Sequence, residues 1–151
     1  MEERVAAARA FFREGYNCCQ SVVLAFEDIA GLDKDSIIKA ACGFGGGMGR
    51  MREVCGTVSA MVMLAGFISP VPSPKDMEAR KANYALVQHL ADSFRKENGT
   101  IYCRELLGMG FEPHKESPQP SERTAEYYKK RPCEELVGLS AGFVANYLKT
   151  L

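Results

Sequence analysis

Four cysteines stand where helices are expected to begin. They are spread along the chain as Cys18, Cys55, Cys103 and Cys133. The first turn of a helix leaves backbone N–H groups unpaired and carries a partial positive charge, which favours the thiolate form of a cysteine. A thiolate is the reactive form in disulfide exchange and the form that binds metal ions. The four positions therefore predict a chemical role.

The spacing of the cysteines matches no local metal or redox motif. The sequence contains no C-x-x-C pair, which zinc ribbons and thioredoxin-like dithiols use, and no ferredoxin spacing. Any site must be assembled by the fold from separate helices. Three interpretations stay open: thiol–disulfide or electron-transfer chemistry, ligation of zinc or an iron–sulfur cluster by the same four thiols, and a helical interaction module whose cysteines only pack.

The two remaining cysteines have weaker claims to a role. Cys19 is adjacent to Cys18, and such neighbouring pairs are often incidental. Cys42 is predicted to end a helix, where the dipole opposes a thiolate. We expect both to be structural, unless the fold brings Cys42 beside Cys18 or Cys55.

A glycine-rich segment lies shortly before Cys55. Residues 43–49 read Gly-Phe-Gly-Gly-Gly-Met-Gly, which a regular helix does not tolerate. The segment lacks the Gly-Lys-Ser/Thr of a P-loop and follows a helix rather than a strand. It is either a tight connection that lets two helices cross closely or a cradle for an anion or a cluster sulfur. The candidate cradle residues are Gly45, Gly46, Gly47 and Arg50.

Helical spacing of apolar residues dominates the chain, and strand alternation is nearly absent. Capping and breaking residues mark the ends of the helices. The expected elements are a first helix ended by Gly15, a second from Asn17 to Gly31, a third from Asp33 or Asp35 through Ala41, a fourth from about Val54 to Ile68, a fifth from about Lys75 to Lys96, a short helix at Cys103, an exposed loop over 112–124, a helical turn or two up to Lys130, and a last helix from Pro132. The fourth helix is apolar on nearly every side, as a buried central helix should be. We expect one all-α domain over residues 1–151, a bundle of about five to seven helices.

The composition excludes several classes of partner. Lys plus Arg and Asp plus Glu number 19 each, so no bulk charge would attract nucleic acid or anionic lipid. The most apolar stretch, residues 58–68, is far shorter than the roughly 20 residues of a membrane span, and the acidic start of the chain does not resemble a secretory signal. We expect a cytoplasmic protein with a redox partner protein, and apolar helix faces leave room for a homodimer. In a reducing compartment, six cysteines in a chain of 151 residues point to metal or redox chemistry rather than to disulfide staples.

Several segments that carry these residues resemble the C_GCAxxG_C_C family. They are Gly15-Tyr16-Asn17-Cys18, Gly43-Phe44-Gly45-Gly46-Gly47-Met48, Val54-Cys55-Gly56, Cys103-Arg104-Glu105-Leu106 and Cys133-Glu134-Glu135-Leu136-Val137. The family consists of small bacterial and archaeal proteins with four recurrent cysteines, to which a redox role is ascribed. The resemblance covers nearly the whole chain and implies a redox role for the four cysteines without naming a reaction, an electron partner or a cofactor. Thr57 and Ala60 stand where the family has Ala and Gly, and Cys19 and Cys42 are extra to the family pattern.

Overall fold

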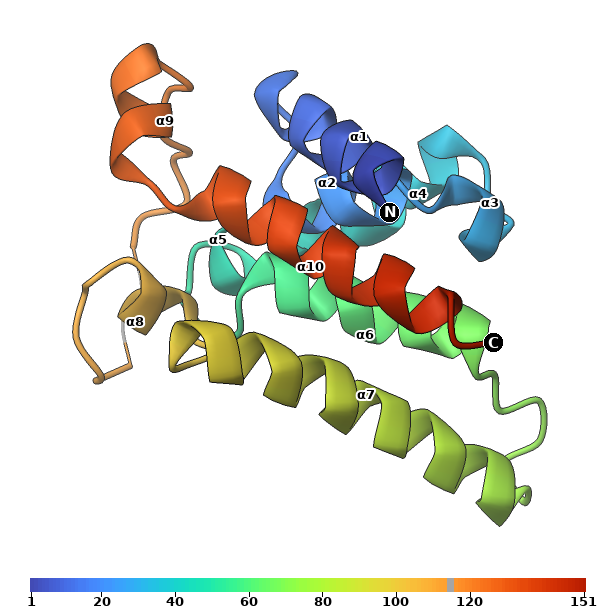
Figure 1. The fold of residues 1–151 in the computed structure, drawn as a ribbon. Coiled ribbons are helices and arrows are strands. Elements are labelled where there is room, and N and C mark those ends of the chain that lie inside the picture. The colour runs from blue at the N-terminus through green and yellow to red at the C-terminus, as the bar shows by residue number, and fades with distance from the viewer. Residues whose placement is uncertain (114–115) are drawn as a thin grey trace.

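Residues 1–113 and 116–151 are described by the computed structural model, and within them the chain is all-α, as the apolar spacing predicts. Its elements are α1 (Glu2–Arg13), α2 (Cys18–Leu24), α3 (Glu27–Ala30), α4 (Lys34–Ala41), the 3-10 turn η1 (Cys42–Phe44), α5 (Gly45–Met48), α6 (Gly56–Ile68), α7 (Met77–Asn98), α8 (Cys103–Leu106), α9 (Ala125–Lys130) and α10 (Cys133–Leu148) (Figure 1). The helices α1, α4, α6, α7 and α10 are eight residues or longer. The others are shorter pieces, and these raise the number of helices above the predicted range.

The apolar helix α6 forms the centre of the bundle. It packs against α2, α7 and α10, and α1 lies against α10 on the outside (Figure 1). Met61 and Leu64 of α6 are fully buried, together with Phe12 of α1, Phe94 of α7 and Val137 of α10. Each such side chain contributes about 1.5–3 kcal/mol when it is buried, so the apolar faces hold the helices in place.

Two helix boundaries differ from the prediction because of contacts made elsewhere in the chain. The predicted second helix is interrupted, since Phe26 has φ −124° and ψ 31° between α2 and α3. This break leaves the carbonyl of Ala25 to accept a hydrogen bond of 2.9 Å from Arg4, whose guanidinium lies 4.7 Å from the centre of the buried Phe26 ring. The central helix begins two residues later than predicted because Val54 pairs with Tyr102 in an antiparallel bridge.

The glycine-rich segment is a tight connection, as one of its two interpretations predicts. Gly46 and Gly47 have φ of 68° and 69°, in the left-handed region that favours glycine. A Cβ on Gly47 would lie 2.6 Å from the Cβ of Cys103 and 2.9 Å from the Cα of Arg52. A Cβ on Gly56, at the start of α6, would lie 3.2 Å from the Cβ of Cys18. The glycines therefore let three chain segments that carry cysteines approach one another.

The predicted loop before α9 is largely exposed but is fixed at both ends. Residues 112–113 and 116–124 contain no helix, and His114 lies outside the described residues. The Glu116 carboxylate accepts a hydrogen bond of 2.8 Å from Arg52 and also pairs with Arg50. Arg123 donates two hydrogen bonds of 3.1 Å to backbone carbonyls at the end of α1 and in the turn after it. These bonds hold the segment against the ends of the helices that carry the cysteines.

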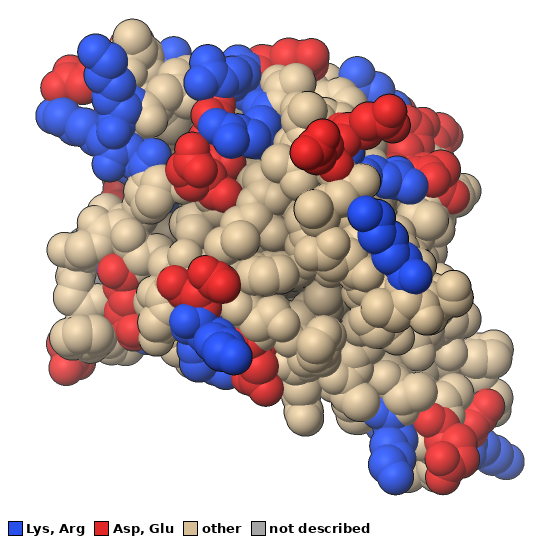
Figure 2. Space-filling model, viewed as in Figure 1, with Lys and Arg blue, Asp and Glu red and all other residues tan. Residues whose placement is uncertain are grey.

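Charged side chains of both signs are intermixed around the edge of the face in Figure 2, and its centre is mostly uncharged. This pattern agrees with the balanced composition. No helix within residues 1–113 and 116–151 combines the length and the apolar character needed to cross a bilayer. The homodimer and the redox partner stay predictions.

A cavity lined by four cysteines

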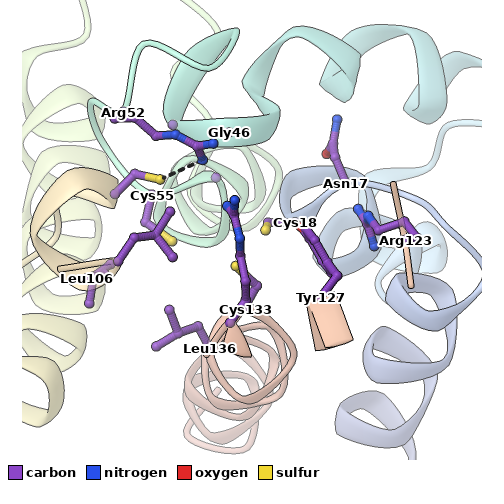
Figure 3. A pocket seen from close by; sticks show the side chains of 15 residues that line it. Asn17, Cys18, Gly46, Arg52, Cys55, Leu106, Arg123, Tyr127, Cys133 and Leu136 are labelled. Atoms are coloured by element: carbon purple, nitrogen blue, oxygen red, sulfur yellow. Dashed lines mark hydrogen bonds between the residues drawn. The ribbon is translucent and has the colours of Figure 1, made fainter. Parts of the chain in front are cut away.

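The fold brings Cys18, Cys55, Cys103 and Cys133 together around one cavity of about 50 Å³. Three of them are the first residues of α2, α8 and α10, and Cys55 is the residue directly before α6. The predicted placement at helix starts is therefore confirmed. Figure 3 shows sulfur atoms from different helices facing the same space.

A capping box at Asn17 positions Cys18. The Asn17 side chain accepts a hydrogen bond of 2.8 Å from the backbone N–H of Gln20, and the Gln20 side chain accepts one of 3.0 Å from the backbone N–H of Asn17. The Asn17 amide also donates to the carbonyl of Cys42 at 3.0 Å. One side chain thus starts α2 and ties it to the segment that leads into the glycine-rich connection.

Ion pairs with α1 position Cys133. Glu134, the next residue of α10, accepts a hydrogen bond of 3.0 Å from Arg9 and also pairs with Arg13. Gly138, one turn further along, lets the Arg9 side chain pass close to the backbone, because a Cβ there would lie 3.1 Å from Arg9 Cδ. The start of α10 is therefore fixed against α1, which leads through a short turn into α2 and Cys18.

Two extended segments that lie side by side position Cys55 and Cys103. The backbone N–H of Cys55 donates to the carbonyl of Ile101 at 2.8 Å, and the backbone N–H of Cys103 donates to the carbonyl of Glu53 at 2.6 Å. These bonds flank the bridge between Val54 and Tyr102. They use two N–H groups that we expected to stabilise the thiolates.

Three of the four thiols have a raised pKa, so the expectation that each helix start favours a thiolate is wrong for them. Burial raises the pKa of Cys55 to about 11 and also raises that of Cys103, although Arg52 donates to the Cys103 sulfur at 3.6 Å. The pKa of Cys18 lies well above its ordinary value because its thiol donates to the Cys133 sulfur and is buried. The loss of hydration on burial destabilises a thiolate more than the partial positive charge at the start of a helix stabilises it.

Cys133 is the exception, because its pKa is lowered to about 7. The largest cause is the hydrogen bond from the Cys18 thiol, and it outweighs the opposing effect of burial. The positive charges of Arg131, Arg123 and Arg52 lower the pKa further. The cavity is therefore lined by one thiol that ionises near neutral pH, Cys133, and by Cys18, which keeps its proton.

Residues 16–147 match the family described as "putative redox-active protein (C_GCAxxG_C_C)". The chain belongs to the C_GCAxxG_C_C family. The description of the family names a redox role in general terms. All four recurrent cysteines of the family pattern line the cavity. Neither the curated proteins nor the solved structures that were compared match the chain.

The two cysteines that are extra to the C_GCAxxG_C_C pattern lie outside the four-thiol cavity. Cys19 is fully buried, and its sulfur lies 3.6 Å from that of Met63, so it packs in the core, and its structural role stays a prediction. Cys42 is exposed, so it does not fill the core, and it lines a neighbouring cavity. In the described part of the chain, no three His, Cys, Asp or Glu side chains are grouped as a metal site would require, and the zinc or iron–sulfur alternative stays a prediction.

The candidate cradle residues are divided between two cavities. Gly47 lines the four-thiol cavity, Gly45 and Arg50 line the neighbouring one, and Gly46 lines both. The Arg50 guanidinium is already engaged, because it donates to the carbonyl of Ser117 at 2.9 Å and pairs with a carboxylate. Binding of an anion or a cluster by the glycines stays a prediction.

Sequence reasoning missed three residues that line the four-thiol cavity, namely Arg123, Tyr127 and Arg131. They lie in and after a polar, proline-rich segment that reads as an exposed loop and a helical turn. The Arg123 guanidinium stacks on the Tyr127 ring at 5.0 Å, and Arg131 stacks on the same ring at 5.0 Å. The local signal for this cluster is an Arg-x-x-x-Tyr-x-x-x-Arg spacing, in which the arginines lie just before and just after the short helix α9.

Proposed function

We propose that this protein is a thiol–disulfide oxidoreductase in which Cys133 is the attacking thiolate and Cys18 is its partner thiol. The observation that carries the proposal is the pair itself: two cysteines from the starts of different helices line one cavity, and Cys18 is the largest cause of the lowered pKa of Cys133. With a pKa of about 7, Cys133 is about half thiolate at neutral pH. A pKa near the ambient pH is the optimum for an attacking thiol.

The reaction requires two exchanges at Cys133. Its thiolate attacks one sulfur of a substrate disulfide, a mixed disulfide forms, and the first substrate thiolate leaves. Cys18 gives its proton to that leaving thiolate and attacks the Cys133 sulfur, which forms the Cys18–Cys133 disulfide and releases the second substrate thiolate. The protein loses two electrons, and the substrate disulfide gains them.

A dithiol must then reduce the Cys18–Cys133 disulfide, and this step defines the chemistry of the predicted redox partner. A partner protein with a dithiol would exchange with the protein disulfide and leave as a disulfide itself. A cytoplasmic location fits this cycle because a reducing compartment keeps the resting protein in its dithiol form. Cys55 and Cys103 stay protonated at neutral pH, so we assign neither of them the attacking role.

Trapping the mixed disulfide tests this function. Reduced protein is mixed without oxygen with a small disulfide, quenched with acid and analysed by mass spectrometry of its peptides. The Cys18→Ser variant should accumulate the mixed disulfide on the Cys133 peptide, whereas the unaltered protein passes through it to an internal disulfide. Cys133→Ser should abolish the reaction. Cys19→Ala, which removes a neighbouring thiol outside the cavity, should behave as the unaltered protein. Equal reaction of Cys133→Ser and the unaltered protein would refute the proposal.

A further inference from the structure

A second cavity, of about 360 Å³, lies beside the four-thiol cavity. The two cavities share Arg52, Arg123, Tyr127 and Arg131 as lining residues, so the larger one leads to the thiols. Its volume lies in the range of sites for small molecules. Four arginines and no acidic residue line it within the described part of the chain. A substrate in this cavity would meet positive charge on its way to Cys133.

The arginines of this cavity carry more positive charge than their partners neutralise. Arg50 and Arg52 both pair with the single carboxylate of Glu116. Among the described residues, the hydrogen bonds that Arg123 donates go to two backbone carbonyls, and its guanidinium lies over aromatic rings. Arg131 stacks on Tyr127, and among residues 1–113 and 116–151 no carboxylate forms an ion pair with Arg123 or Arg131.

Glu116 and the partly ionised Cys133 offset only part of this positive charge, and holding the remainder at a partly buried site costs free energy, which a bound anion would recover. Arg52 is 3% exposed at its side chain, and Arg123 and Arg131 are partly buried. Figure 3 shows Arg52 and Arg123 on opposite sides of the space that Cys18 and Cys133 face. Figure 2 shows further basic side chains gathered over α9, at the upper left, where the last turn carries Lys129 and Lys130. An anion is therefore attracted from solution and held beside the thiols.

We propose that the arginine-lined cavity binds a carboxylate of a small disulfide substrate, with Arg131 and Arg123 as the recognising groups. A guanidinium matches a carboxylate with two parallel hydrogen bonds, and the aromatic rings already hold both guanidinium planes in place. The inference rests on the proposed function and adds the substrate class: an acidic low-molecular-weight disulfide rather than a neutral or cationic one.

Two disulfides that differ only in their end groups test the proposal. 3,3′-Dithiodipropionate carries two carboxylates, and bis(2-hydroxyethyl) disulfide carries two hydroxyl groups on chains of similar length. The second-order rate constant for oxidation of the reduced protein is measured with each at neutral pH, and their ratio is compared between variants. The ratio removes any change in the acidity of Cys133, because both disulfides react with the same thiolate.

We expect the acidic disulfide to react faster with the unaltered protein, although its charge slows its reaction with thiolates in water. Arg131→Gln should lower the acidic-to-neutral ratio by about tenfold, the effect of one charge-assisted hydrogen-bonded contact. Arg131→Lys, which keeps the charge but not the planar fork, should give an intermediate ratio. Lys81→Gln makes the same change of charge at an exposed position of α7 that lines neither cavity, and it should leave the ratio within about twofold.

Each failure has a separate signature. If Arg131→Gln lowers both rate constants equally, Arg131 only tunes Cys133 and recognition of the carboxylate is refuted. If the unaltered protein oxidises equally fast with both disulfides, the proposed substrate class is wrong while the proposed function stands. If neither disulfide oxidises Cys18 and Cys133, the proposed function itself fails.

Discussion

Removing the Cys18 thiol should raise the pKa of Cys133, because the hydrogen bond from Cys18 is the largest cause of its low value. At pH 7 a thiol with a pKa of about 7 is about 50% thiolate, whereas an ordinary thiol with a pKa of about 8.5 is about 3% thiolate, a ratio of about 16. A thiolate of lower pKa is intrinsically less nucleophilic, by about fivefold over this difference. The net advantage of Cys133 over an ordinary cysteine at pH 7 is therefore about threefold.

The position of the pH midpoint is a sharper measurement than the rate at one pH. Alkylation of Cys133 by iodoacetamide can be followed by mass spectrometry of its peptide between about pH 5 and pH 10. The unaltered protein should show a midpoint near the pKa of about 7. Cys18→Ala should shift the midpoint upward. Cys18→Ser keeps a hydroxyl donor at the same place and should shift it less. Superimposable profiles for the unaltered protein and Cys18→Ala would refute the assignment of Cys18 as the donor.

Three further predictions follow from the fold and the cavity. Gly47→Ala should lower the free energy of unfolding by about 2–4 kcal/mol, because the new Cβ meets Cys103. Gly49 has the same left-handed backbone but lies in open space, so Gly49→Ala should lower the free energy of unfolding by only about 1–2 kcal/mol. Equal losses of the two variants in urea unfolding would contradict this prediction. The hydrogen bonds and charges of Arg13 and Arg9 lower the pKa of Glu134. Its ion pairs therefore stabilise the fold fully at pH values above the ordinary carboxyl pKa of about 4.3, and this stabilisation is lost as the pH falls through the lowered pKa. Glu134→Gln should therefore flatten the acid limb of stability against pH, and an unchanged limb would rule this out. Elemental analysis of protein purified without oxygen should show far less than one zinc or iron ion per chain. A stoichiometric metal with the four thiols as ligands would instead favour ligation of zinc or an iron–sulfur cluster over disulfide exchange.

Local signals in the sequence predicted the starts of the helices that carry the cysteines. Asn17 as a cap and Pro132 next to Cys133 act within one turn, so their effect can be judged without the rest of the fold. The break at Phe26 could not be judged in this way, because it depends on Arg4 from another helix. Helical spacing of apolar residues alone does not show which backbone carbonyl will accept a hydrogen bond from a distant side chain.

The chemistry of the cavity was less predictable than its cysteines. The low pKa of Cys133 depends on Cys18, which is 115 positions away in the chain, and on arginines from a segment that reads as a loop. The high pKa of Cys55 depends on how completely the bundle excludes water from it. The sequence therefore indicated the four thiols but not which of them is the thiolate.

Mapping the first disulfide to form on oxidation tests the central claim most directly. Reduced protein is equilibrated in thiol–disulfide buffers of increasing oxidising strength, quenched with acid, alkylated and digested. The account predicts that a peptide pair linked through Cys18 and Cys133 appears first, while Cys55 and Cys103 are still alkylated as free thiols. If Cys18 and Cys133 stay free thiols while other cysteines of the chain become oxidised, the account is contradicted.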